Sequence, residues 1–116
     1  MSKRITKLLL EDIHDCINSI ETYTENVSFE NFINDRKTYE ATLFNFHLLG
    51  EAASQIPNDL KLKHPDIEWS EIIAFRNKLI HEYFGTSNLI IWDIIKFDLP
   101  QLKIQIQTLL DSNNYE

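Results

Sequence analysis

The start of the chain repeats apolar residues with the period of a helix that is buried on one face. Their spacing of three and four residues is that of an amphipathic helix. The apolar positions are Ile5, Leu8, Leu9, Ile13, Cys16, Ile17 and Ile20. This pattern predicts a helix over about residues 3–25. Ser28 predicts the N-cap of a short helix that contains Phe29, Phe32 and Ile33.

A second long helix is predicted from a cap at Asn34 or Asp35 to about Gln55. Its apolar residues form two arcs on nearly opposite sides, the first of Tyr39, Leu43, Phe46, Leu49, Gly50, Ala53 and Ile56, the second of Ala41, Phe44, Leu48 and Ala52. A helix that is apolar on two sides is typical of a central element packed between neighbours. Glycine inside a helix costs about 1 kcal/mol relative to alanine, so Gly50 predicts the close approach of another backbone.

The middle of the chain predicts two shorter helical segments. Residues 57–65 begin and end with proline and predict a helical turn. Ser70 predicts the N-cap of a helix from Glu71 to about Phe84. Gly85 follows as a candidate C-cap, because glycine adopts the left-handed conformation that ends many helices.

A last helix is predicted from near Ser87 or Asn88 to about Asp111. Isoleucine and leucine recur along it at helical spacing. Pro100 lies in its interior, where it lacks the N–H of the helical ladder, so we expect a kink or an interruption.

Composition supports an all-α fold. The 116 residues include only 2 glycines and 3 prolines, too few for the frequent turns of a β-sandwich or barrel. A single cysteine excludes an internal disulfide and a zinc site made of cysteines. We therefore expect one domain over residues 1–111, an up-and-down bundle of four to five helices, with residues 112–116 as a frayed tail.

Charge and hydropathy restrict the partners. The chain carries 18 acidic and 11 basic residues, a net charge of −7, so binding to nucleic acid by bulk charge is not expected. Contact with RNA or DNA requires a local basic site. The sequence contains neither a signal-peptide core nor an apolar run long enough to span a bilayer. We expect a soluble, cytoplasmic protein without a membrane partner.

Arg76 breaks the apolar face of the predicted helix 71–84. On a helical projection of 100° per residue it falls about 40° from Ile72, within the apolar arc. Arginine is almost never buried unpaired. Arg76 must therefore face a carboxylate, a subunit interface or a cleft that admits an anion.

Three further polar residues follow Arg76 on this helix. Asn77 and His81 are four residues apart and share a face, and Tyr83 lies seven residues after Arg76. Arginine offers a fork of donors that matches a phosphate, and histidine exchanges protons near neutral pH. These groups are sufficient for metal-free RNA cleavage, in which a 2′-hydroxyl attacks the adjacent phosphate.

The run Arg76-Asn-Lys-Leu-Ile-His81-Glu-Tyr83 resembles the Arg-x4-His-x-Tyr motif of HepT-type toxins in the HEPN superfamily. The resemblance covers nearly the whole chain, with further landmarks in the family's order. These are Ser28-Phe-Glu-Asn-Phe, Asp35-Arg-Lys-Thr, Leu49-Gly-Glu-Ala-Ala, Pro65-Asp-Ile-Glu-Trp, Ile91-Trp92 and Asp98-Leu-Pro100. The short motif arises often by chance, but the ordered set is specific.

The resemblance implies a HEPN-like homodimer that acts as an endoribonuclease toxin. Arg76 and His81 of both subunits would line one composite cleft, with Asn77 as a polar neighbour. It also implies a nucleotidyltransferase antitoxin of the MNT type, which transfers AMP from ATP to Tyr83. No cofactor is implied, and no carboxylate cluster has the spacing of a two-metal site.

Other polar residues are weaker candidates. Glu51 lies beside Gly50 and could pair with Arg76, orient His81, or be an ordinary carboxylate on the flank of its helix. Asp35 and Arg36 could flank the cleft, although helix capping explains Asp35 equally well.

Two other hypotheses about the function of the chain stay open. A non-catalytic helical subunit that helps a nucleotidyltransferase bind its substrate would use Arg76 and His81 to hold a nucleotide phosphate. A dimerising bundle without chemistry would hold Arg76 in a buried salt bridge.

Overall fold

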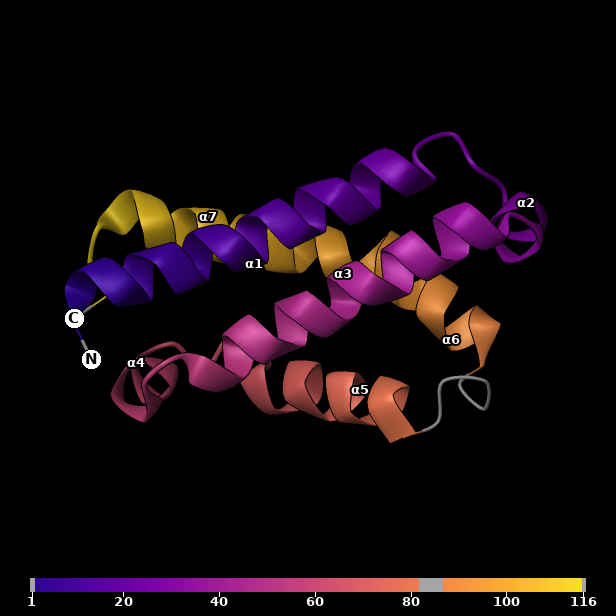
Figure 1. Cartoon of the computed structure of the whole chain (residues 1–116). Helices are drawn as coiled ribbons and strands as arrows, with labels where there is room; N and C mark the ends of the chain where they lie inside the picture. Colours follow the sequence, from indigo (N-terminus) through magenta and orange to yellow (C-terminus); the bar gives the residue numbers. More distant parts are fainter. Residues whose placement is uncertain (1, 82–86, 116) are drawn as a thin grey trace.

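The structure is a computed structural model that describes residues 2–81 and 87–115 (Figure 1). Every regular element in these two ranges is helical, which confirms the predicted all-α class. The elements are α1 (Lys3–Thr24), α2 (Phe29–Asn34), α3 (Arg36–Gln55), α4 (Asn58–Lys63), α5 (Trp69–His81), α6 (Asn88–Asp93), a π-helical segment η1 (Ile94–Asp98) and α7 (Leu99–Ser112).

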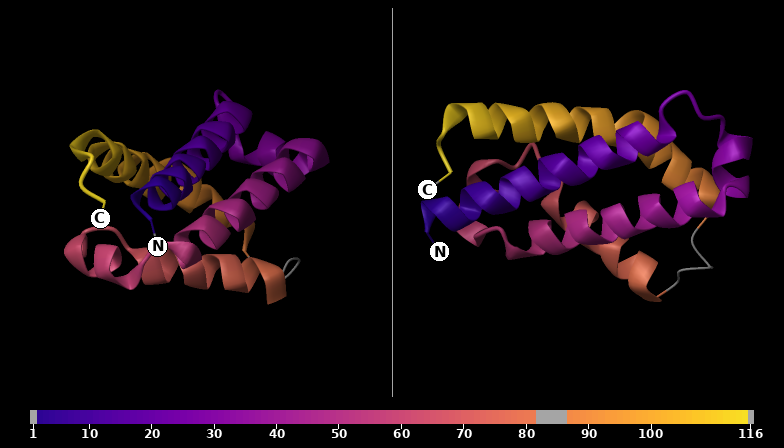
Figure 2. Two further views of the ribbon diagram at one scale, coloured as in Figure 1. Left: turned by 60° about the vertical axis from the view of Figure 1, so that its left-hand side comes forward. Right: turned by 45° about the horizontal axis from the view of Figure 1, so that its top comes forward.

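Successive long helices run in opposite directions, as expected for an up-and-down bundle (Figures 1 and 2). Helix α3 crosses the middle of the molecule, with α1 on one side and α5 on the other. The run from α6 to α7 returns along α1, so the N- and C-terminal segments lie at the same end of the bundle. No helix in the described ranges is long and apolar enough to cross a membrane.

The best-packed part of the molecule is the contact of α1 with α3 and α7. Side chains along one face of α1 are buried at helical spacing, and Leu10, Ile17 and Ile20 are fully buried. They belong to the same apolar core as Leu49 and Ala53 of α3. This part of the fold follows directly from the sequence pattern.

Local caps fix the ends of the first helices as predicted. The Ser28 hydroxyl accepts a hydrogen bond from the Asn31 N–H at 3.1 Å, and α2 begins directly after it. Asp35 rather than Asn34 caps α3, where its carboxylate accepts from the N–H and the hydroxyl of Thr38. These hydrogen bonds, the one from the hydroxyl first, hold the pKa of Asp35 below its ordinary value.

Helix α5 begins two residues earlier than the sequence predicts. Ser70 is not its N-cap but lies in the first turn, because the helix already starts at Trp69. The indole N–H of Trp69 donates to the carbonyl of His64 at 3.2 Å, and the side chain is buried. A tertiary anchor therefore sets this helix end. The predicted end at Phe84 and Gly85 lies outside the described residues.

The predicted interruption of the last helix is a π-helical segment. Helix α6 begins at Asn88 as expected, and Ser87 is its N-cap, with its hydroxyl oxygen 3.5 Å from the Ile90 nitrogen. After α6 the ladder widens in η1, where the Leu99 N–H donates to the carbonyl of Ile94, five residues back. Pro100 then lies in the first turn of α7, where its missing N–H costs nothing.

One prediction about α3 is wrong for a single copy of the chain. The helix is central, as expected, but its second apolar arc is only partly covered. Ala52 is buried, whereas the side chains of Phe44 and Leu48 are 60% and 40% exposed. Helix α5 packs chiefly on α3 and leaves this outer face open.

The last described residues fold back toward the core. Asn113 adopts a left-handed conformation that ends α7, and its N–H donates to the carbonyl of Leu110. The chain then turns back, and the ring of Tyr115 is buried in the core, with the Lys3 ammonium 5.6 Å from its centre. The burial of the Tyr115 ring thus places this segment against the core, although its other residues are polar.

Candidate functional site

The candidate site is built where α5 lies against α3, at Gly50. A Cβ atom added to Gly50 would overlap the Cβ of Arg76 and lie 2.6 Å from its Cγ. The backbone carbonyl of Ile72 would be 3.5 Å away. The predicted close approach at Gly50 is confirmed, and its partner is the aliphatic stem of Arg76 together with the backbone of α5. Only a glycine lets the two helices meet at this distance.

The head of Arg76 is held by Glu51. Its Nη1 donates to Oε2 of Glu51 at 2.7 Å, and the two side chains are 16% and 47% exposed. Of the roles left open for Glu51, pairing with Arg76 is the one that the structure contains. The pair lies at the edge of the α3–α5 contact, so solvent screens it in part.

Arg76 keeps unused donors. Its Nε is buried and has no hydrogen-bond partner within the described ranges. Leaving a buried donor unpaired costs about 1–3 kcal/mol, so native proteins rarely tolerate it without a use for it. Arginine presents its donors as a planar fork, and one arm is occupied by Glu51. The remaining donors can bind an oxygen of a phosphate or carboxylate without any loss of the existing pair.

Asn77 and His81 lie on the exposed surface of α5. Neither side chain has a hydrogen-bond partner in the part of the chain that the structure describes. His81 follows Arg76 by five residues, which places it about 140° around the helix and about 7.5 Å along it. In a single copy of the chain, Arg76 therefore lies at the contact of α3 with α5 and His81 faces solvent, so the two do not share one cleft.

Tyr83, the remaining residue of the motif, lies outside the described residues. Asp35 and Arg36 are described but lie elsewhere, at the start of α3. Arg36 bonds to Glu40 at 2.6 Å within its own helix. Gly50 follows Arg36 by fourteen residues along α3, about 21 Å away at 1.5 Å per residue. One copy of the chain does not bring Asp35 and Arg36 to the Arg76 site.

Exposed apolar residues surround the Arg76–Glu51 pair, and the sequence did not identify them as part of a site. Phe44 and Leu48 lie on the open face of α3, two turns and one turn before Glu51 respectively. Ile80 lies on α5, one turn after Arg76, and is 49% exposed. The sequence feature that could have identified Phe44 and Leu48 was the second apolar arc of α3, which we expected to pack within one chain. In the described ranges, no three or more His, Cys, Asp or Glu side chains are grouped so as to hold a metal ion.

Comparison with known proteins identifies the family. The sequence model of the family described as Ribonuclease HepT-like matches residues 13–109, which include Glu51, Arg76 and His81. The chain belongs to the HepT-like ribonuclease family. The resemblance found in the motifs is thus confirmed, and with it the class of enzyme, a ribonuclease.

Relatives of this family match nearly the full length of the chain. A protein of Thermococcus cleftensis named "Probable ribonuclease HepT" is 43% identical over 107 residues, which are 92% of this chain and 97% of that protein. A protein of Methanocaldococcus jannaschii named as an RNase is 36% identical over 107 residues, 92% of this chain and 98% of its own. No solved structure gives a significant match.

Proposed function

We propose that this member of the HepT-like ribonuclease family is the toxin of a toxin–antitoxin pair and cleaves RNA in the cytoplasm without a metal ion. The observation that supports it most is the partly exposed guanidinium of Arg76, which gives one donor to Glu51 and has others left for a ligand. A guanidinium held in place by an ion pair is positioned to bind an anion. A backbone phosphate of RNA has the charge and the geometry to bind there.

The chemistry divides between two side chains. Arg76 binds the scissile phosphate and stabilises the charge that develops on its oxygens. His81 takes the proton of the 2′-hydroxyl as that oxygen attacks phosphorus, and a histidinium donates a proton to the leaving 5′-oxygen. Asn77 lies one turn before His81 and holds the ring or a phosphate oxygen. The products are a 2′,3′-cyclic phosphate and a 5′-hydroxyl.

A homodimer completes the cleft in this proposal. Arg76 and His81 of one chain diverge by about 140° around α5, so one copy alone offers no complete site. A second copy against the exposed Phe44, Leu48 and Ile80 would cover apolar surface and bring the two α5 helices together. A stable interface of this kind buries at least about 1,000 Å² in total.

Control of the toxin by its partner would act at Tyr83. A nucleotidyltransferase antitoxin of the MNT type would transfer AMP from ATP to the Tyr83 hydroxyl, with release of pyrophosphate. The attached phosphate would satisfy the free arm of Arg76 and exclude RNA by charge and size. Mass spectrometry of the Tyr83 peptide after incubation with the antitoxin and ATP tests this step, with Tyr83→Phe as the unmodifiable control.

The decisive experiment expresses the chain alone and maps new ends in total RNA. We expect cleavage that persists in EDTA, and its loss in Arg76→Ala and in His81→Ala. Arg4→Ala and His14→Ala on α1 are matched controls and should cleave normally. Cleavage by Arg76→Ala at the normal rate would overturn the assignment. A chain that cleaves nothing yet binds the antitoxin would favour the non-catalytic subunit.

A further inference from the structure

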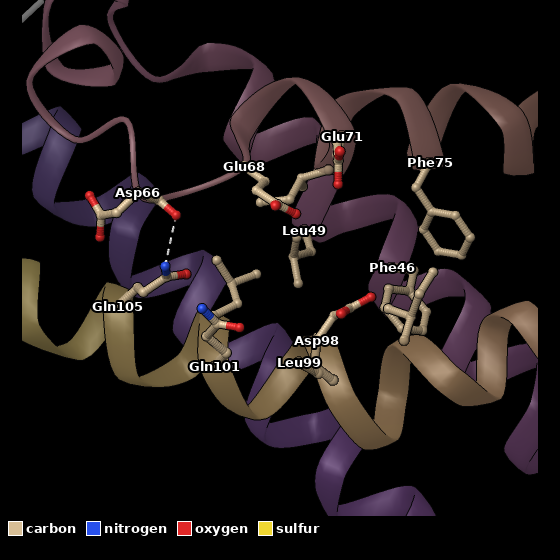
Figure 3. A pocket seen from close by; sticks show the side chains of 13 residues that line it. Phe46, Leu49, Asp66, Glu68, Glu71, Phe75, Asp98, Leu99, Gln101 and Gln105 are labelled. Atoms are coloured by element: carbon tan, nitrogen blue, oxygen red, sulfur yellow. Dashed lines mark hydrogen bonds between the residues drawn. The ribbon is translucent and has the colours of Figure 1, made fainter.

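A second candidate site lies beside the first half of α5, before Arg76 in the chain. It is a cavity of about 200 Å³ between α5 and the end of η1 with the start of α7 (Figure 3). Its floor is apolar and comes from three parts of the chain. Phe46 and Leu49 belong to α3, Phe75 to α5 and Leu99 to α7. The rings of Phe46 and Phe75 meet edge to face at 5.2 Å and close one end.

The rim of this cavity is acidic. Glu68, directly before α5, and Glu71, in the first turn of α5, reach it from one side, and Asp98 reaches it from η1 across the opening (Figure 3). No Lys, Arg or His is among the lining residues. None of the three carboxylates forms an ion pair with a basic residue in the described ranges. The cavity therefore combines an apolar floor with negative charge that the chain itself does not neutralise.

The three carboxylates act on one another. A hydrogen bond to Glu71, the charge of Glu71 and the charge of Asp98 raise the pKa of Glu68 above its ordinary value. The three groups are thus close enough to repel, and a positive charge among them would relieve the repulsion. Two amides complete the lining, Gln101 and Gln105, of which Gln105 donates to the carbonyl of Asp66 at 2.8 Å.

The chemistry of the cavity selects its occupant. A divalent metal ion requires carboxylates grouped around one point, and the described residues contain no such group. A neutral apolar molecule would leave the rim charges unpaired, and an anion would be repelled. What fits both surfaces is a short aliphatic chain that carries more than one ammonium group.

We propose that this cavity binds an aliphatic polyamine, with its methylene chain on the apolar floor and its ammonium groups among Glu68, Glu71 and Asp98. The methylene groups gain from the burial of apolar surface. Each ammonium group has three donors for carboxylate oxygens. This site is independent of RNA cleavage: it shares α5 with Arg76 but none of the residues that touch the Arg76 head.

Isothermal titration of the full chain at low salt tests the proposal. Spermidine and putrescine are the probes, and 1,4-butanediol and succinate are their neutral and anionic counterparts of similar chain length. We expect saturable binding of the two amines only. Glu68→Gln/Glu71→Gln should weaken it at least about tenfold, because two of the three rim charges are removed. This variant removes repulsion, so its melting temperature should not fall, and lost binding cannot be ascribed to unfolding.

A charge-matched variant makes the result specific. Asp12→Asn/Asp15→Asn removes the same charge from the exposed surface of α1 and should bind as the unchanged chain does. Equal weakening in both double variants would reduce the effect to bulk charge and overturn the proposal. Displacement of spermidine by Mg²⁺ at equal charge concentration would overturn it also, as would binding of 1,4-butanediol with the affinity of putrescine.

Discussion

Helices α1 and α5 both pack on α3, yet they bury very different shares of their side chains. Helix α1 lies between α3 and α7 and buries an apolar residue in nearly every turn. Helix α5 rests chiefly on α3 and buries only Trp69 and Leu79 along its described length. The residues with chemistry lie on α5. The comparison teaches that α1 specifies the fold, while α5 is a lightly held element that carries the candidate site.

The largest expected effect is the difference in unfolding free energy between a variant of α1 and a variant of α5. Ile17→Ala in α1 should lower the free energy of unfolding by about 2–5 kcal/mol, because it leaves a cavity in the core. Ile80→Ala in α5 should change it by less than about 0.5 kcal/mol in a single copy, since that side chain is half exposed. Urea unfolding of both variants measures this. Similar losses for both would show that α5 is as firmly packed as α1.

A second expected effect comes from the contact that holds α5 in place. Gly50→Ala improves helix propensity by about 1 kcal/mol but places a Cβ against Arg76. Overpacking of this kind costs about 1–3 kcal/mol, so the net change should be destabilising and should reduce RNA cleavage by moving Arg76. Thermal unfolding and cleavage rates measure it. Gln55→Ala, on the exposed side of α3, is the control, and a more stable Gly50→Ala variant would contradict the tight contact.

A smaller effect is expected from Glu51, which positions Arg76. Glu51→Ala should cost about 0.5–1 kcal/mol, a value limited by the exposure of the carboxylate. In a double-mutant cycle with Arg76→Ala the two losses should not add, because each removes the same ion pair. Cleavage should fall in Glu51→Ala and recover in part in Glu51→Gln, which keeps an acceptor oxygen. Additive losses in the cycle would show that the pair contributes nothing.

The smallest effect concerns the acidic start of α5. The raised pKa of Glu68 means that the folded state holds this proton more tightly than the unfolded state. Its contribution to stability is thus present at low pH and is lost as the pH rises from the ordinary glutamate range through the raised value. Glu68→Gln should raise the melting temperature at pH 7 and leave it unchanged near pH 3. Melting curves at both pH values decide this, and a lower melting temperature at pH 7 would contradict it.

Local signals made much of the fold predictable from the sequence. Ser28 and Asp35 bond to backbone groups three residues away, so the ends of α2 and α3 depend only on neighbouring residues. The apolar spacing of α1 was equally informative, because a single face is buried. The start of α5 was not predictable, since Trp69 is fixed by burial and by the carbonyl of His64.

The need of Arg76 for a partner was predictable, but the contact that meets it was not. The position of Arg76 in an apolar arc required a partner, and the sequence left several open. Glu51 is that partner, at a separation of 25 residues, and the choice depends on how α5 crosses α3 at Gly50. The exposure of Phe44 was not predictable, because an apolar arc is the same in sequence whether its own chain covers it or a second one does.

The π-helical segment η1 shifts the phase of the last helical run. One extra residue in a helical turn rotates the preceding helix, α6, by about 100° relative to the following helix, α7. Trp92, before the shift, stacks near Phe32 at 5.1 Å, whereas Ile106, after it, is buried in the contact with α1. A single-residue gap at this place in an alignment therefore marks a rotation of α6 relative to α7. It is not a neutral difference in length.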